Sequence, residues 1–132
     1  MRWFTTIEAF DRWRQGGPIE RTLQPAIAEA LRQIGCLEPP AALKGVLAWL
    51  AERRRVPHLK EIADQCSSRR TFFRAWRTMP ETPARFLQRV RAIHAKSLLS
   101  AGYESSDAAS LAGYPSVESM RQRITARREA QG

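Results

Sequence analysis

Residues 59–78 read LKEIADQCSSRRTFFRAWRT, and this stretch predicts two short helices joined by a tight turn. Leu59–Gln65 supplies about two helical turns, Cys66-Ser67 turns the chain, and Ser68 can cap a second helix over 68–78. Apolar residues recur in this second helix at i, i+3, i+4 and i+7, the spacing of one helix face. We expect that face to be buried; its residues are Phe72, Ala75, Trp76 and Met79.

The other face of the predicted 68–78 helix is cationic. Arg70, Arg74 and Arg77 share it with Phe73. Guanidinium groups bind phosphates and guanine edges bidentately, and the second helix of a helix-turn-helix lies in the major groove of DNA. A solvated arginine face is the alternative, but the preceding short helix, the turn and the cap favour DNA. Phe73 is expected to pack on a thymine methyl group or beneath another protein.

The same short pattern recurs further along the chain. A long helix over about 84–101 ends at Gly102, and Ser105/Ser106 are expected to cap a short helix that ends at Ala112. Gly113-Tyr114-Pro115 then turns the chain into a last helix over 116–128. No stretch alternates as a strand would. The sequence therefore predicts an all-α fold with two helix-turn-helix subdomains joined by a long helix, preceded by a short N-terminal helical segment.

The N-terminal part predicts further helices. One follows Thr5/Thr6 and stops at Gly16-Gly17-Pro18, and another lies within 19–34, where Pro25 is a candidate first residue. A third lies around 43–50, with Arg53–Arg55 in its last turn. Pro39-Pro40 separates the second from the third. We therefore expect a helical segment over 1–40, used for packing or dimerisation, and a DNA-binding domain over 41–132.

The net charge of +9 is confined to one part of the chain. Residues 1–40 hold five Arg and five acidic residues, whereas residues 41–132 hold 17 basic and 8 acidic residues. An Arg-rich composition explains the preference for Arg over Lys, but it does not explain this confinement. A basic segment beside a neutral one indicates a module that binds a polyanion.

The order of these residues resembles the DNA-binding domain of the AraC/XylS transcription regulators, over about residues 43–124. The family has Ser-Pro-Arg-Thr-Leu-x-Arg-x-Phe-Lys in its first unit, and residues 68–77 read SRRTFFRAWR in the same phase. Pro-x-x-Tyr-Leu-x-x-x-Arg-Leu-x-x-Ala-x-x-Leu-Leu follows, and residues 83–99 read PARFLQRVRAIHAKSLL. The second unit's Ile-Ala-x-x-x-Gly-Phe-x-Ser corresponds to AASLAGYPS at 108–116.

The chain departs from the family pattern in four places. The loop 79–83 is one residue short and lacks the usual Gly, and Glu118 and Gln122 stand where the family has Ser and Arg. The closing Gly-x-x-Pro segment has no counterpart, and residues 1–40 are too short for the family's β-barrel sensor. We expect the second unit to fold on Met120 and Ile124 but to bind DNA weakly.

The resemblance implies a bacterial, cytoplasmic, nucleoid-associated transcription regulator that binds double-stranded DNA, with helix 68–78 as the main reading helix. RNA polymerase is a further candidate partner, and the family's arginine at the position of Arg91 implies a structural role that bonds the two units together. From the aromatic residues of the segment 1–40 we expect a homodimer through it as an alternative to packing on the basic domain. Phosphate contacts are expected from Arg69, Arg77, Lys96 and Arg121, and base contacts from Arg70, Phe73 and Arg74. The whole expected set is Ser68, Arg69, Arg70, Phe73, Arg74, Arg77, Lys96, Ser116, Ser119, Arg121 and Gln122.

The alternative function is that of a degenerate relative, which binds a protein partner through residues 1–40 and DNA only weakly. An enzyme is not expected, because we find no nucleophile–base pair, metal-ligand cluster or glycine loop that could hold phosphates. No cofactor, metal or membrane span is expected. Cys36 and Cys66 are expected to be reduced, buried thiols, and His58 and His94 to lie at helix starts or on the surface.

Overall fold

The computed structural model describes residues 22–131, and this part of the chain is entirely helical. The predicted all-α class is confirmed for these residues, whereas the helix predicted after Thr5/Thr6 lies outside them. The helices in chain order are α2 (Gln24–Gln33), α3 (Ala41–Ala51), α4 (Leu59–Ala63), α5 (Arg69–Trp76), α6 (Pro83–Ser100), α7 (Ser105–Ala112) and α8 (Val117–Gln131).

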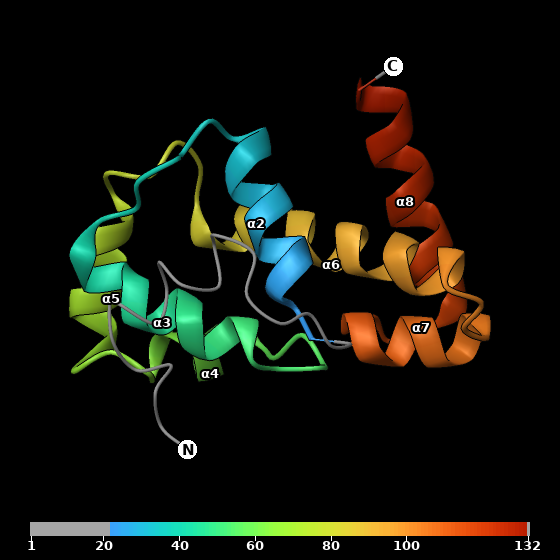
Figure 1. Ribbon diagram of the computed structural model, residues 1–132, viewed down its shortest axis with the longest axis horizontal. Helices are drawn as coiled ribbons and strands as arrows, with labels where there is room; N and C mark the ends of the chain where they lie inside the picture. Colours follow the sequence, from blue (N-terminus) through green and yellow to red (C-terminus); the bar gives the residue numbers. More distant parts are fainter. Residues whose placement is uncertain (1–21, 132) are drawn as a thin grey trace.

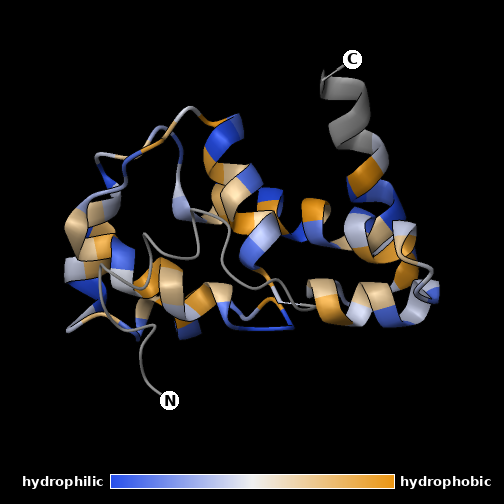
Figure 2. Cartoon of the chain, in the orientation of Figure 1, coloured by the Kyte–Doolittle hydropathy of each residue, from blue (hydrophilic) through white to orange (hydrophobic). Residues whose placement is uncertain are grey.

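The long helix α6 is the axis of the molecule. It packs against α2 and α4 on one side of its midpoint and against α7 and α8 on the other. In Figure 1 it runs along the longest dimension, with α5 at one end of the molecule and α8 standing across it at the other. The helices carry both hydrophobic and hydrophilic residues, as Figure 2 shows, so each can bury one face and expose another.

Two hydrophobic cores share α6. The first contains Phe86, Leu87 and Val90 from the first half of α6, together with buried residues of α2, α3, α4 and α5. The second contains Ala95 and Leu98 from the second half, packed with α7 and with Met120 of α8. One rigid helix therefore fixes the relative position of the two cores.

The helix α2 belongs to the first core. Leu23, Ile27 and Leu31 are at most 3% exposed and pack in the same cluster as Leu43 and Leu47 of α3. The chain enters this helix with Leu23 N donating to the carbonyl of Arg53 at 2.8 Å. Within the described residues, the segment before Pro39-Pro40 therefore packs on the segment after it.

Local capping signals fix the ends of the central helices. Ser68 Oγ accepts from Thr71 N at 3.1 Å at the start of α5, and Thr82 Oγ1 accepts from Arg85 N at 3.2 Å at the start of α6. Pro83 is in the first turn of α6, where its missing N–H is no loss. Gly113 ends α7 at φ +89°, a left-handed conformation that a side chain rarely adopts. The predicted cap at Ser68 and the predicted end of α7 at Gly113 are confirmed. Ser105 and Ser106, in contrast, do not cap α7, because Glu104 stands at its N-cap and makes no side-chain bond.

The arginines after α3 do not extend it, so the prediction that Arg53–Arg55 fill its last turn is wrong. The helix ends at Ala51, and residues 52–58 form a strap that crosses to the second core. Val56 N donates to the carbonyl of Leu111 at 2.9 Å, and Arg55 donates to Ser110 Oγ at 2.9 Å. Pro57 keeps the chain from resuming a helix at Val56, because a residue that precedes proline is disfavoured in the helical region.

His94 is buried beneath this strap, contrary to the predicted surface position. His94 is 4% exposed, and its Nε2 lies 3.1 Å from the carbonyl oxygen of Arg54. A carbonyl only accepts, so Nε2 carries the proton of a neutral ring. Burial lowers the pKa of His94 below its ordinary value, and the Arg54 carbonyl opposes this effect only in part. No disulfide joins Cys36 and Cys66, which are half-buried.

The burial of His94 predicts a loss of stability in mild acid. The unfolded chain protonates this ring near pH 6.5 while the folded protein holds it neutral, so stability is retained above about pH 6.5 and falls below it. We expect the free energy of unfolding to fall by up to about 1.4 kcal/mol per pH unit there, measured by urea denaturation. His94→Gln, which keeps a donor but cannot be protonated, should remove this slope, whereas His58→Asn at an exposed position should keep it. An unchanged slope in His94→Gln would contradict the assignment.

Candidate nucleic-acid interface

The exposed face of α5 carries unpaired cations. Arg70, Arg74 and Arg77 are exposed, and Phe73 between them is 44% exposed. On the opposite face Phe72 and Trp76 are 0% and 4% exposed. None of the three arginines forms an ion pair or a side-chain hydrogen bond within the described residues. The predicted division of this helix into a buried and an exposed face is therefore confirmed.

The start of α5 is held by two polar contacts. Ser68 caps the helix, and Arg69 Nε donates to Asp64 Oδ1 of the preceding turn at 2.8 Å. The Arg69 guanidinium lowers the pKa of the Asp64 carboxyl group. Both side chains are about half exposed, and an ion pair of this kind contributes little to stability. Arg69 can therefore exchange this partner for another anion.

The exposed face of α8 is less cationic. Arg121 and Gln122 are exposed, but Gln122 Nε2 lies 3.4 Å from Glu118 Oε2, so a carboxylate occupies the same face. Ser116 Oγ accepts from Ser119 N at 3.1 Å and caps the helix. The polar side chains of this first turn are thus partly used by the helix itself.

The expected site residues fall into two groups rather than one patch. Those of α5 and those of α8 lie at opposite ends of the molecule in Figure 1. Lys96 is exposed on α6, which connects them. The structure therefore presents two separate polar faces, held at a fixed spacing by one helix.

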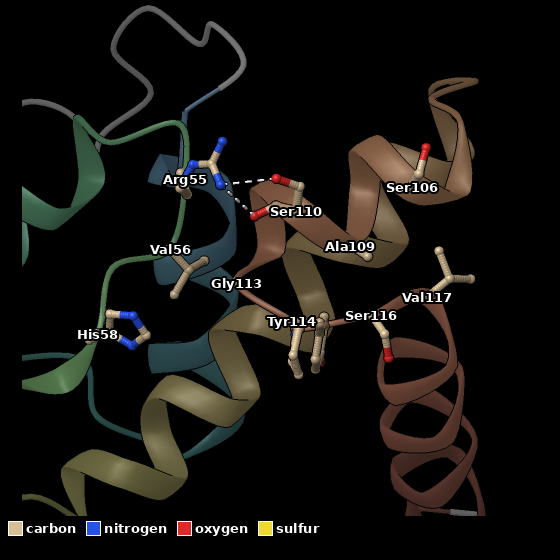
Figure 3. Close-up of a pocket in the computed structure, with 11 residues that line it drawn as sticks. Arg55, Val56, His58, Ser106, Ala109, Ser110, Gly113, Tyr114, Ser116 and Val117 are labelled. Carbon is tan, nitrogen blue, oxygen red and sulfur yellow. Dashed lines mark hydrogen bonds between the residues drawn. The ribbon is translucent and has the colours of Figure 1, made fainter.

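An open groove of about 610 Å³ lies between these faces, where the strap meets the second core. Arg55 and His58 enter it from the strap, and Ser106, Tyr114 and Ser116 from α7 and the turn before α8, as Figure 3 shows. Arg55 is held in place by its bond to Ser110. Neither Arg55 nor His58 was predicted as a site residue, because the bond that positions Arg55 spans 55 positions of the chain.

A second, smaller cavity lies between α6 and α8. It has a volume of about 230 Å³, and Arg91 and Arg123 line it. The predicted bond from Arg91 across the two units is not present: its Nε is buried without a hydrogen-bond partner in the described part of the chain. Arg91 instead lies against Gly113, where an added Cβ would be 3.3 Å from Nε. Arg123 was not predicted as a site residue either.

In comparisons with known proteins, no family model, no curated protein and no solved structure matches this chain significantly.

Residues that could hold a metal are not grouped together anywhere in the described range, where no three His, Cys, Asp or Glu side chains cluster. None of the helices in that range is long and apolar enough to cross a membrane.

Proposed function

We propose that this chain is a sequence-specific DNA-binding transcription regulator similar to the AraC/XylS proteins. In this proposal α4–α5 and α7–α8 are two helix-turn-helix units, joined by α6, and α5 is the main reading helix. The observation that carries the proposal is the exposed face of α5, where Arg70, Arg74 and Arg77 have no acidic partner among the described residues. A face built only of donors suits an anionic partner with acceptor edges, which describes a major groove.

The packing of α5 supports this orientation. Phe72 and Trp76 are fixed in the first core, and the Trp76 ring lies 5.4 Å from the Phe86 ring of α6. The Trp76 indole also donates to the carbonyl of Glu81 at 2.8 Å. Because the packing of Phe72 and Trp76 fixes the rotation of α5 about its axis, the cationic face points in one fixed direction. A reading helix needs such a fixed orientation.

The two proposed units are unequal. The α5 face has no carboxylate, whereas Glu118 of α8 sits beside Gln122 and would repel a phosphate. In this proposal Arg121 and the first turn of α8 contact the phosphate backbone of the DNA, and α5 supplies most of the discrimination between bases.

The groove between the units fits the proposal as well. A duplex that met both α5 and α8 would run past the strap, where Arg55 and His58 are exposed. Cations there would contact the backbone without reading sequence.

RNA polymerase and a second copy of the chain remain proposed partners. The alternative function, binding of a protein through residues 1–40, is not favoured by α2, since its apolar side chains are in the first core; of the residues that follow it, Leu37 is 68% exposed. Those partners would therefore have to use residues 1–21, which lie outside the described residues, or another surface.

The test is a selection of binding sites from random duplex DNA, followed by substitution on the selected site. We expect Arg74→Ala to weaken binding by about 1–3 kcal/mol and to relax the preference at one or two base pairs. Gln122→Ala should have a smaller effect, and Arg32→Ala, at an exposed arginine of α2, should have none. Recovery of no sequence motif, or a larger loss in Gln122→Ala than in Arg74→Ala, would contradict the proposal.

A further inference from the structure

The cavity between α6 and α8 is lined by groups that can donate hydrogen bonds. Among the residues whose side chains the structure describes, the charged ones that line it are both arginines, and none is a carboxylate. The neutral polar side chains can each donate as well. The polar lining consists of Gln88 and Arg91 of α6, Tyr114 of the turn, and Ser119 and Arg123 of α8. Such a lining has the chemistry of an anion site.

Arg91 is the residue whose state most needs an explanation. Its Nε is buried and makes no hydrogen bond, and no acidic side chain pairs with its guanidinium in the described part of the chain. Burial lowers the pKa of Arg91, the Tyr114 side chain opposes this effect in part, and the positive charge of Arg123 lowers the pKa by a smaller amount. A half-buried cation beside a second cation is unfavourable, and a bound anion would remove that cost.

The position of Arg91 is set by the fold rather than by chance. Its guanidinium lies against Gly113, which leaves room for it because glycine has no Cβ. Gly113 in turn is fixed by its left-handed conformation at the end of α7. The helix α6, which carries Arg91, and Gly113 at the end of α7 therefore hold Arg91 in the cavity that Arg123 of α8 also lines.

We propose that this cavity binds a phosphate-class oxyanion between the guanidiniums of Arg91 and Arg123. Its volume of about 230 Å³ is below the ~300–1,000 Å³ of sites for larger organic ligands, and paired guanidiniums match the oxygens of a phosphate. The proposal rests on the proposed function in one respect, because a phosphodiester of bound DNA is one source of the anion. A free phosphate or a small phosphorylated molecule is the other. In either case the anion links α6 to α8 and fixes the direction of the second proposed reading helix.

The first arm of the test uses inorganic phosphate and the full chain. Thermal unfolding is measured in phosphate and in chloride at equal ionic strength, and the side-chain Nε–Hε signal of Arg91 is followed by NMR. We expect a saturable shift of that signal and a rise in Tm of about 5 °C at ten times Kd. Arg123→Gln, at an exposed position that should not disturb folding, and Arg91→Gln should both lose the rise. Arg85→Gln, which removes an exposed charge from α6 outside the cavity, should keep it.

The second arm uses the selected duplex and separates the two sources. If a DNA phosphodiester occupies the cavity, Arg123→Gln should reduce the slope of log K against log salt by about 1, and Arg32→Gln should leave it unchanged. A slope that is unchanged in Arg123→Gln, together with a saturable phosphate shift in the first arm, assigns the cavity to a free phosphate. The proposal is overturned if neither arm shows an effect, or if phosphate raises the Tm of Arg123→Gln as much as that of the unsubstituted chain. It would leave DNA reading by α5 untouched, whereas phosphate binding without any DNA binding would overturn the proposed function alone.

Discussion

Replacement of Phe72 by alanine is expected to lower the free energy of unfolding by about 3–5 kcal/mol. Phe72 is 0% exposed, and its ring lies 5.4 Å from that of Trp76 and 5.1 Å from that of Phe73. The substitution would leave a cavity in the first core, at the point where α5 is attached to α3 and α6. The measurement is chemical denaturation followed by tryptophan fluorescence.

The adjacent residue provides the matched control. Phe73→Ala removes the same side chain from an exposed position, and its effect on stability should be about 0.5 kcal/mol. Phe73→Ala should affect DNA affinity more than it affects stability, because Phe73 stands between Arg70 and Arg74 on the proposed reading face. If Phe73→Ala destabilised the protein as much as Phe72→Ala, the assignment of the two faces of α5 would be wrong.

The sequence predicted the helices well where local chemistry decides them. The spacing of Phe72 and Trp76 identified the buried face of α5, and Ser68 its first turn, because both signals lie within one or two helical turns. Gly113 marked the end of α7 for the same reason. The class of fold follows from such local signals, since every element in the described range is a helix.

Contacts between distant parts of the chain could not be predicted in this way. Arg53–Arg55 resemble cations that stabilise a helix end, yet Arg55 bonds to Ser110 and the carbonyl of Arg54 meets His94. Nothing near residue 55 in the sequence specifies partners so far along the chain. For the same reason the burial of His94 was missed, since it depends on the strap above it.

In the candidate site, too, local features could be predicted from the sequence, whereas the partners of individual side chains could not. Periodicity identified which residues of α5 are exposed, but not that Arg69 is paired with Asp64 while Arg74 has no partner in the part of the chain that the structure describes. Arg91 was assigned a bond that it does not make, because a motif gives its position and not its partners. The pair Ser119 and Arg123, four positions apart on one face of α8, was the signal that could have indicated the second cavity.

The affinity for DNA is expected to depend steeply on salt. Arg69, Arg77, Lys96 and Arg121 are all exposed and are the proposed phosphate contacts. Each neutralised phosphate releases a condensed counterion, so four contacts predict a slope of about −3.6 for log K against log salt. Between about 50 and 200 mM salt the affinity should therefore fall by about 10².

The slope can be assigned to individual side chains by substitution. Arg77→Gln and Arg121→Gln should each reduce it by about 1, since each removes one phosphate contact. Arg32→Gln provides the control, because this arginine of α2 is exposed but already paired with Glu29. Fluorescence anisotropy with the selected duplex, at five or so salt concentrations, measures all four proteins. A slope near zero for the unsubstituted chain would remove the electrostatic basis of DNA binding, and an equal reduction in Arg32→Gln would show that net charge, rather than the α5 and α8 faces, determines the affinity.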